Sequence, residues 1–197
     1  MIEVIAEHSV DTSLLNRSSK VLDLGCRYFG WSKAMLQYVD KVYCVDADDT
    51  IETYEPRFNF LNVAVSNESE KYVSFVKYGN GTGNYINEGE PFPIQSVISN
   101  VFCMNLKSVS KHFGVEFWDL IKFDIEGSET DILLNLKEPP ATQITFETHQ
   151  HTSKRKTDGQ LQNMFNHLKQ WYNFVHIDYS RKHGLSENYW DVLAILK

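Results

Sequence analysis

The sequence predicts an α/β fold built on a doubly wound, mostly parallel sheet with an antiparallel C-terminal strand. Three observations predict it. Short β-rich runs alternate with helical patterns, several of these runs end in acidic residues, and the last two strand-like runs follow one another directly. Alternation of this kind is typical of βαβ units, while two successive strands indicate a final hairpin. A chain of 197 residues fits one domain, so residues 1–197 are expected to form a single α/β domain.

Eight runs have the composition of strands. They are Lys20–Leu24, Lys41–Val45, Phe58–Val65, Lys71–Lys77, Asp119–Phe123, Gln143–Phe146, Phe174–Asp178 and Trp190–Leu196. Lys71–Lys77 alternates between apolar and polar residues, which suits an edge or hairpin strand. The segment Tyr78–Asn100 is rich in Gly, Asn and Pro and is predicted to be a long loop. Long loops inside a compact domain are often functional lids.

Four segments have helical patterns. They are Trp31–Val39, Lys107–Phe113, Glu129–Leu136 and Gly159–Trp171. Asn105 is placed to cap the second of these helices, and Gly114 to end it. Ser128 and Asp131 resemble a capping box at the start of the third helix. For the helices Lys107–Phe113 and Glu129–Leu136, the sequence therefore predicts capping residues as well as the helix itself.

Composition and charge exclude several classes of protein. Apolar residues make up 42% of the chain and charged residues 23%, as in ordinary globular proteins, and the net charge is −7. An acidic balance argues against a protein that grips a nucleic-acid backbone, which needs a basic face. Met1–Val10 has no basic start followed by an apolar stretch, and no run approaches the length of a membrane span. Three cysteines without a C-x-x-C pair fit a reducing compartment, so a cytoplasmic location is expected.

Acidic residues stand at or near the ends of four predicted strands. They are Asp23, Asp46, Asp124 and Glu147. In open α/β sheets, ligands bind outside the carboxyl ends of the strands. Turn chemistry explains any one of these residues, but four on one rim predict a binding site there.

The loop Asp23–Gly30 and the strand end at Asp46 indicate a nucleoside-type cofactor. Gly25 allows a sharp bend, and Gly30 is expected to let the next helix pack tightly on the sheet. Asp46 lies where an acidic side chain accepts hydrogen bonds from ribose hydroxyls. A dinucleotide requires G-x-G-x-x-G, but here bulky residues separate the two glycines. A cofactor without phosphates and with a cationic tail that faces Asp23 fits better, and S-adenosylmethionine is the natural candidate.

The segment Ile121–Glu129, with the sequence IKFDIEGSE, resembles the signature of FkbM-type methyltransferases. The resemblance extends over the Asp23-Leu24-Gly25 turn, Val42–Asp46, Asn62–Ser66 and Glu147-Thr148-His149. It implies a class I methyltransferase fold, S-adenosylmethionine as the cofactor, and O-methylation of hydroxyls on sugars or small metabolites. The turn between Gly25 and Gly30 is one residue longer than is usual in the family, and Asp46 stands where the family more often has Glu.

The chemistry of methyl transfer suggests roles for the acidic residues. A hydroxyl must be aligned with the methyl group and must lose its proton. Asp124 is the first candidate for base or anchor near the methyl group, and Glu126 is a candidate for orienting the loop or the acceptor. Glu147 and His149 alternate along one strand end, so their side chains are expected to point to one face. With Asp124 they form either a base relay or a Mg²⁺ site, and no metal is assigned.

The cofactor-binding prediction comprises six residues. They are Asp23, Gly25, Gly30, Asp46, Ala64 and Asp124, with Ala64 in the segment expected beside the adenine. Two other functions stay open at this point: a non-catalytic module that binds S-adenosylmethionine, and an oxidoreductase with a nucleotide cofactor. The partner is expected to be a small-molecule or sugar acceptor, not a nucleic acid or a membrane. The sequence names neither the acceptor nor the oligomeric state.

Overall fold

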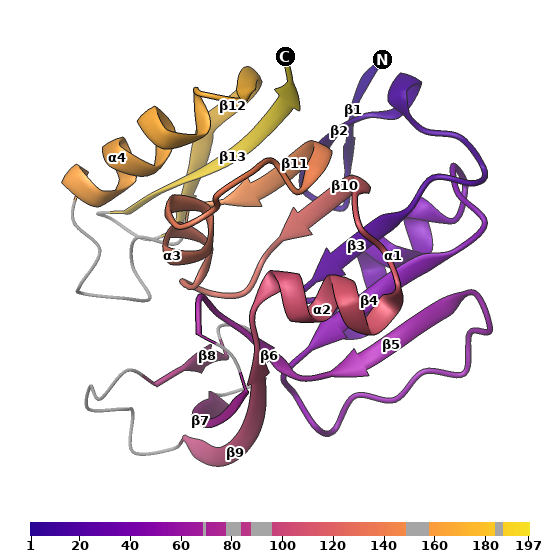
Figure 1. Ribbon diagram of the computed structural model, residues 1–197, viewed down its shortest axis with the longest axis vertical. Coiled ribbons are helices and arrows are strands. Elements are labelled where there is room, and N and C mark those ends of the chain that lie inside the picture. Colours follow the sequence, from indigo (N-terminus) through magenta and orange to yellow (C-terminus); the bar gives the residue numbers. More distant parts are fainter. Residues whose placement is uncertain (69, 78–83, 88–95, 149–157, 184–186) are drawn as a thin grey trace.

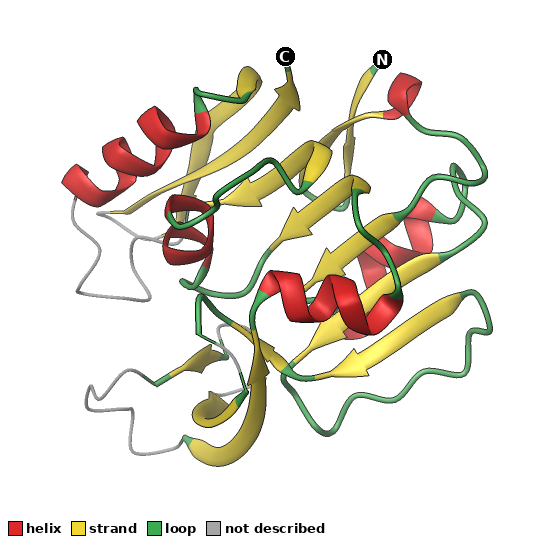
Figure 2. Cartoon of the chain, viewed as in Figure 1, coloured by secondary structure: helices red, strands yellow, loops and turns green. Residues whose placement is uncertain are grey.

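A computed structural model describes residues 1–68, 70–77, 84–87, 96–148, 158–183 and 187–197, with the backbone alone at 158, 178–183 and 187–190. Its centre is a seven-stranded sheet (Figures 1 and 2). In spatial order the strands are β12 (Tyr172–His183), β13 (Glu187–Leu196), β11 (Ala141–Glu147), β10 (Trp118–Phe123), β3 (Val21–Leu24), β4 (Val42–Asp46) and β5 (Phe58–Asn62). The strand order changes direction between β3 and β10, which is the topological switch point where such sheets bind ligands.

The predicted C-terminal hairpin is confirmed. Strand β13 runs antiparallel to both β12 and β11, while β11, β10, β3, β4 and β5 are mutually parallel. The register aligns Asp23 with Lys122 and Glu147 with Asp191. Since aligned residues of paired strands share a face, these charged side chains lie on one side of the sheet.

The two faces of the sheet carry different side chains. One face is apolar, with residues such as Leu22, Phe123 and Phe146 in the larger hydrophobic core. On this side lie α2 (Leu106–Phe113), α3 (Glu129–Leu134) and α4 (Asp158–Leu168) (Figures 1 and 2). The other face carries a smaller core together with buried polar residues, among them Asp23 and Lys122. Helix α1 (Gly30–Met35) lies on this second face.

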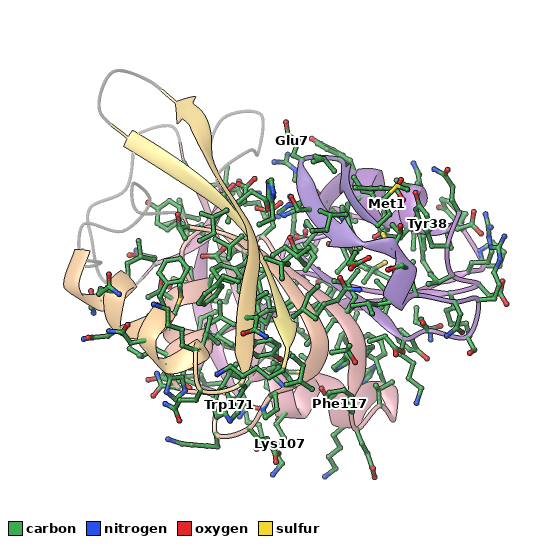
Figure 3. All side chains as sticks on the ribbon, turned by 90° about the horizontal axis from the view of Figure 1, so that it is seen from above. Met1, Glu7, Tyr38, Lys107, Phe117 and Trp171 are labelled. Carbon is green, nitrogen blue, oxygen red and sulfur yellow. The ribbon has the colours of Figure 1, made fainter. Side chains whose placement is uncertain are left out.

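An N-terminal hairpin, which the sequence did not predict, covers the rest of the polar face. It comprises β1 (Ile2–Ile5) and β2 (His8–Asp11), joined by the two-residue turn Ala6-Glu7. Figure 3 shows Glu7 at the tip of this hairpin, on the opposite side of the molecule from Lys107 of α2. Both turn residues have positive φ, 41° and 80°. Such turns favour Asn-Gly or Asp-Gly, so Ala-Glu gives no signal of a hairpin in the sequence.

Contacts between side chain and backbone attach the hairpin to the sheet. The Asp11 N–H donates to Gln143 Oε1 at 3.0 Å, and Gln143 Nε2 donates to the Asp11 carbonyl at 3.2 Å. Tyr38, beyond α1, donates to Glu3 Oε2 at 3.0 Å. The hairpin is therefore attached both to β11 of the main sheet and to the segment that follows α1.

A second, four-stranded sheet corrects two predictions. The run Phe58–Val65 is not one strand, because β5 ends at Asn62 and Ala64–Val65 forms β6 in the smaller sheet. That sheet has the order β6, β9 (Val97–Met104), β7 (Lys71–Lys77), β8 (Tyr85–Ile86). Strands β8 and β9 both fall within or begin in Tyr78–Asn100, so the described part of this segment is not simply a loop. Residues 78–83 and 88–95 lie outside the described residues.

The helix boundaries were predicted with mixed success. Asn105 caps α2 as expected, its Oδ1 accepting from the Ser108 N–H at 2.9 Å, and Gly114 ends the helix in the left-handed conformation. Ser128 is the N-cap of α3 but makes no capping hydrogen bond with its side chain, so the predicted capping box is wrong. Among the described residues, no helix is long and apolar enough to cross a membrane.

Candidate functional site

A cavity of about 360 Å³ opens at the carboxyl ends of β3, β4 and β10. Its walls come from the loop after β3, the end of β4, the link between β5 and β6, the turn after β10, strands β7 and β8, and the tip of the N-terminal hairpin. This volume is within the range of small-molecule sites. The sequence placed the site at this rim, and the cavity lies there.

Gly25 occupies a position where no other residue fits. Its φ is +79°, its N–H donates to the Val45 carbonyl at 2.9 Å, and a Cβ built on it would lie 1.7 Å from the Asp124 carbonyl oxygen. The backbones of the β3 loop and the β10 turn touch here. Gly25 therefore allows the close approach of two chain segments that both line the cavity.

Gly30 is at the cavity for a different reason than expected. It begins α1 with an ordinary φ of −60°, and a Cβ built on it would meet nothing within 4 Å. The prediction that Gly30 allows α1 to pack tightly on the sheet is therefore wrong. Gly30 does line the cavity, so its missing side chain leaves the wall open to a ligand.

The extra residue of the turn is accommodated by left-handed backbone. Tyr28 and Phe29 have φ of 58° and 57°. Phe29 is buried and stacks on Phe58 with ring centroids 5.1 Å apart, while Tyr28 is 67% exposed and lies under the Arg27 guanidinium. Two consecutive non-glycine residues in this conformation are strained, and such strain is often found where a loop is shaped for a ligand.

Asp23 forms a buried ion pair beneath the cavity. Its side chain is fully buried, Oδ1 lies 2.9 Å from Lys122 Nζ, and Oδ2 accepts from the Ser32 hydroxyl. The sequence led us to expect a cofactor cation opposite this carboxylate, whereas the structure places the ammonium of Lys122 there. Direct contact of Asp23 with a cofactor stays a prediction, and its partner Lys122 is a site residue that the sequence reasoning missed.

Lys122 connects three parts of the site. Besides Asp23, its Nζ contacts Asp124 Oδ2 at 3.2 Å and donates to the Gly25 carbonyl at 3.1 Å. Burial alone would lower the pKa of Lys122, but the two carboxylates outweigh it and raise the pKa above its usual value. The lysine is thus a permanent buried cation that fixes the positions of the glycine loop and Asp124.

Asp46 ends β4 at the cavity wall, as predicted. It is 9% exposed, and Oδ1 accepts from the Asp48 N–H at 2.9 Å. Burial, with the nearby charges of Asp48 and Asp23, raises the pKa of Asp46 to about 6 in spite of that hydrogen bond. Ala64 lines the same cavity, so the structure brings the predicted ribose and adenine residues together.

The raised pKa of Asp46 predicts how cofactor affinity depends on pH. Only the ionised carboxylate accepts hydrogen bonds from two ribose hydroxyls, so protonation of the ligand-free protein competes with binding. We expect the affinity for S-adenosylmethionine to be constant above pH 7 and to fall below about pH 6, by up to about tenfold per pH unit. Calorimetry between pH 5 and 8 measures this. Asp46→Asn removes the titrating group and should give weak binding that loses this pH dependence; a wild-type affinity that stays flat down to pH 5 would contradict the assignment.

The turn after β10 is held by Glu129 and not by Ser128. The Ile125 N–H donates to Glu129 Oε1 at 2.7 Å, and the Gly127 N–H donates to Oε2 at 2.8 Å. Glu126 and Gly127 are in the left-handed region, with φ of 55° and 112°. The last acidic residue of the IKFDIEGSE segment thus shapes the turn that presents Asp124 and Glu126 to the cavity.

Glu147 and His149 are the predicted site residues that the described cavity does not include. Glu147 is buried on the polar face, beside Asp191 in the register, and is not among the residues that line the cavity. His149 lies outside the described residues. Within the part of the chain that is described, no cluster of His, Cys, Asp or Glu is arranged to hold a metal ion. The base relay therefore stays a prediction.

Two further residues lie at this site: Trp31, which the sequence leaves open as a core residue or a wall of the cofactor pocket, and His8, which the sequence does not single out. The indole N–H of Trp31, a cavity residue that is 4% exposed, has no hydrogen-bond partner among the described residues. His8 of the N-terminal hairpin is buried 3.6 Å from Asp124 Oδ2. A buried donor without a partner suggests a ligand in the cavity. No pattern in the sequence places His8 here, because the turn that precedes it has no hairpin signal.

Comparison with protein families decides the identity. Residues 43–184 match the model of the methyltransferase FkbM domain, which covers most of the chain. The chain belongs to the FkbM methyltransferase family. The resemblance seen in the sequence is thereby confirmed, and S-adenosylmethionine is the cofactor of this methyltransferase. Comparison with curated proteins finds no match.

Solved structures confirm the fold. The chain is similar to a fibrillarin pre-rRNA processing protein of Methanococcus jannaschii, with 11% identity, a TM-score of 0.56, and coverage of 100% of this chain and 70% of that one. It is also similar to an rRNA methylase of Streptococcus thermophilus, with 10% identity, a TM-score of 0.50, and coverage of 94% and 90%. A putative hemolysin of the same organism has 13% identity, a TM-score of 0.52, and coverage of 92% and 60%. At these identities the likeness establishes an α/β methyltransferase-like fold and nothing about the acceptor.

Proposed function

We propose that this FkbM methyltransferase transfers a methyl group to a hydroxyl of an uncharged sugar or small metabolite. One observation carries the proposal: Asp124, held by Lys122, lies at the wall of a cavity that also contains Asp46 and the Gly25 loop. The carboxylate that would receive a hydroxyl is therefore in the same cavity as the residues expected to hold the cofactor.

The residues present fit S-adenosylmethionine. Asp46 offers a carboxylate for the ribose hydroxyls, and Ala64 offers an apolar wall for the adenine. The buried N–H of Trp31 is a donor that needs an acceptor such as the carboxylate of an amino-acid tail. Bound there, the cofactor supplies a methyl group on a sulfonium, whose sulfur leaves without needing a proton.

The chain's own residues have two tasks in the proposed reaction. Asp124 accepts a hydrogen bond from the acceptor hydroxyl and takes its proton, which aligns the oxygen with the methyl group. Glu126, at the same wall in a strained turn, orients the acceptor. Glu147 and His149 are proposed to pass the proton onward.

We also propose that residues 1–197 act as one cytoplasmic domain, a location that fits the three free, buried cysteines.

The charges around the cavity favour an uncharged acceptor over an anionic one. Glu7, Asp124 and Glu126 line it together with Arg27, while Lys122 is engaged by Asp23 and Asp124. With Asp23 and Asp46, five carboxyl residues line the cavity against the two cations Arg27 and Lys122, and this excess of negative charge repels phosphate groups. Two of the similar structures are named for ribosomal RNA, so RNA is the second candidate acceptor. The net charge of −7 argues against it.

Calorimetry with S-adenosylmethionine, S-adenosylhomocysteine and NAD tests the cofactor assignment. We expect both sulfur compounds to bind at one site and NAD to give no heat of binding, because the Gly25–Gly30 loop lacks the bare backbone that a pyrophosphate requires. Binding of NAD with no response to either sulfur compound would instead support the oxidoreductase alternative.

Transfer of a labelled methyl group tests the acceptor class. The purified chain is incubated with S-adenosylmethionine carrying a labelled methyl and with three pools: neutral sugars and small alcohols, the corresponding phosphates, and RNA. We expect label in the first pool only, and less than about a tenth of that amount after Asp124→Asn. Label in RNA would overturn the acceptor proposal. Cofactor binding with transfer to none of the pools would favour the non-catalytic module.

A further inference from the structure

The tip of the N-terminal hairpin forms part of the cavity wall. Ala6 and Glu7 line the cavity, and both are held with positive φ although neither is glycine. A non-glycine residue in this conformation is strained and persists only where its surroundings enforce the conformation. The hairpin is therefore fixed in place by something other than its turn, and the residues that follow the turn show what fixes it.

His8 and Ser9 connect the hairpin to strand β13 and to the turn after β10. Asp191 Oδ2 on β13 accepts from the Ser9 N–H at 3.0 Å and from the Ser9 hydroxyl at 2.7 Å. This leaves Asp191 Oδ1 facing His8 Nδ1 at 3.6 Å. On the other side of the ring, His8 Nε2 lies 3.6 Å from Asp124 Oδ2. His8 is only 2% exposed, so the imidazole is enclosed between two carboxylates.

The charges around His8 favour its protonated form. Burial lowers the pKa of His8 and so does the charge of Lys122 on β10, but the contacts with Asp124 and Asp191 outweigh both and raise it. A neutral imidazole has one N–H and would leave one carboxylate opposite a lone pair, whereas an imidazolium turns an N–H toward each carboxylate. At 3.6 Å both contacts are ion pairs and are longer than hydrogen bonds. Glu147 lies beside Asp191 on the same face and adds negative charge to this region.

Asp124 is consequently contacted by two cations at one oxygen. Lys122 Nζ approaches Oδ2 at 3.2 Å from within the sheet, and His8 Nε2 approaches the same oxygen at 3.6 Å from the hairpin. Side-chain carboxylates rotate freely unless contacts on different sides fix them. We propose that His8 is a positioning residue that fixes the orientation of Asp124 at the cavity, so that the N-terminal hairpin is part of the methyl-transfer site. The proposal rests on the proposed function in one respect, that Asp124 faces the bound cofactor and acceptor.

The titration of His8 is the first test, and it needs no ligand. The full chain carrying labelled histidine is followed by NMR from pH 5 to 9, with the His8 signal assigned by its loss in His8→Gln. We expect a midpoint above 6.5 that falls in Asp124→Asn and also falls in Asp191→Asn, because each substitution removes one of the carboxylates that raise the pKa. Asp40→Asn, which removes an exposed carboxylate, is the control and should leave the midpoint unchanged. If Asp191→Asn does not fold, Asp124→Asn decides alone, because Asp124 is 30% exposed and tolerates substitution better.

Stability provides a matching readout with a definite sign. A histidine whose pKa is raised on folding contributes stability that is complete below pH 6.5 and is lost as the pH rises through the folded value. As the pH rises from 6.5 through the pKa of His8 in the folded protein, the stability of the wild type should therefore decrease relative to that of His8→Gln. A His8 midpoint below 6.5, or one that Asp124→Asn does not change, would overturn the proposal.

A double-mutant cycle separates positioning from a general structural role. We expect His8→Gln to weaken binding of S-adenosylmethionine about fivefold in the wild type and less than about twofold in Asp124→Asn. His112→Gln, at an exposed site on α2, is the control and should not change the affinity in either background. Equal losses in both backgrounds would mean that His8 only supports the fold. Absence of cofactor binding in the wild type would instead refute the proposed function, and the NMR titration would still decide whether His8 contacts Asp124.

Discussion

Gly25→Ala should cost at least about 3 kcal/mol of folding stability and abolish binding of S-adenosylmethionine. Two effects add at this position. The backbone has φ of +79°, and the new methyl would lie 1.7 Å from the carbonyl oxygen of Asp124. That oxygen belongs to the backbone and cannot rotate away as a flexible side chain does. The β3 loop and the β10 turn must therefore separate, which opens the cavity that both segments line.

Gly30→Ala is the matched control for this prediction. The same methyl at Gly30 meets nothing within 4 Å and the φ is ordinary, so stability should stay within about 0.5 kcal/mol or rise slightly. Denaturant titration measures the stability of both variants, and calorimetry measures their affinity for the cofactor. If Gly25→Ala were as stable as Gly30→Ala, the close approach of Gly25 to Asp124 would be wrong.

Lys122→Met should destabilise the protein by about 3–5 kcal/mol. Methionine replaces most of the volume of lysine, so packing is largely retained. What is lost is the cation that neutralises the fully buried Asp23 and holds Asp124, at 2.9 and 3.2 Å. Burying an unpaired carboxylate away from water costs free energy. This cost is larger than the net stabilisation that the intact ion pair provides.

A second substitution shows whether the buried charge is the cause. Adding Asp23→Asn to Lys122→Met removes the stranded charge and should recover about half of the lost stability. Lys71→Met is the surface control: Lys71 and its partner Glu68 are 51% and 64% exposed, so breaking that pair should cost less than about 0.5 kcal/mol. No recovery in the double variant would mean that Lys122 acts mainly through packing.

The main sheet could be predicted because its strands carry their signals locally. Val21–Leu24, Val42–Asp46 and Trp118–Phe123 are short apolar runs that end in or next to a carboxylate, and all three form adjacent interior strands of the sheet. The C-terminal hairpin was predicted from two strand patterns with no helix between them. The N-terminal hairpin could not be predicted, since its Ala-Glu turn is stabilised by contacts with β11 and β13 and not by turn residues.

A cavity lies at the rim where the sequence predicts a binding site, but the sequence did not predict the partners of the acidic residues there, and ligand binding at this rim stays a prediction. Asp46, Ala64 and Asp124 line one cavity, as their positions at strand ends implied. Lys122 was visible in the IKFDIEGSE segment, but as an alternating residue of a buried strand it had no assigned role. Its partnership with Asp23 depends on the pairing of β3 with β10, which brings together residues that are 99 positions apart.

The α/β class and, through the IKFDIEGSE segment, the family could be predicted from the sequence alone, and so could the rim of the sheet at which the cavity lies. These features depend on residues that are close together in the sequence, so the periodicity of apolar residues and short motifs indicate them. Only the tertiary structure decided that the cation beside Asp23 is Lys122, that Glu129 and not Ser128 shapes the Asp124 turn, and that His8 reaches Asp124 from the N-terminus. Each of these is a contact between buried polar groups on different segments. A buried charged group is stable only when it has a partner. That partner can come from any segment that the fold brings close, so it cannot be read from neighbouring positions in the sequence.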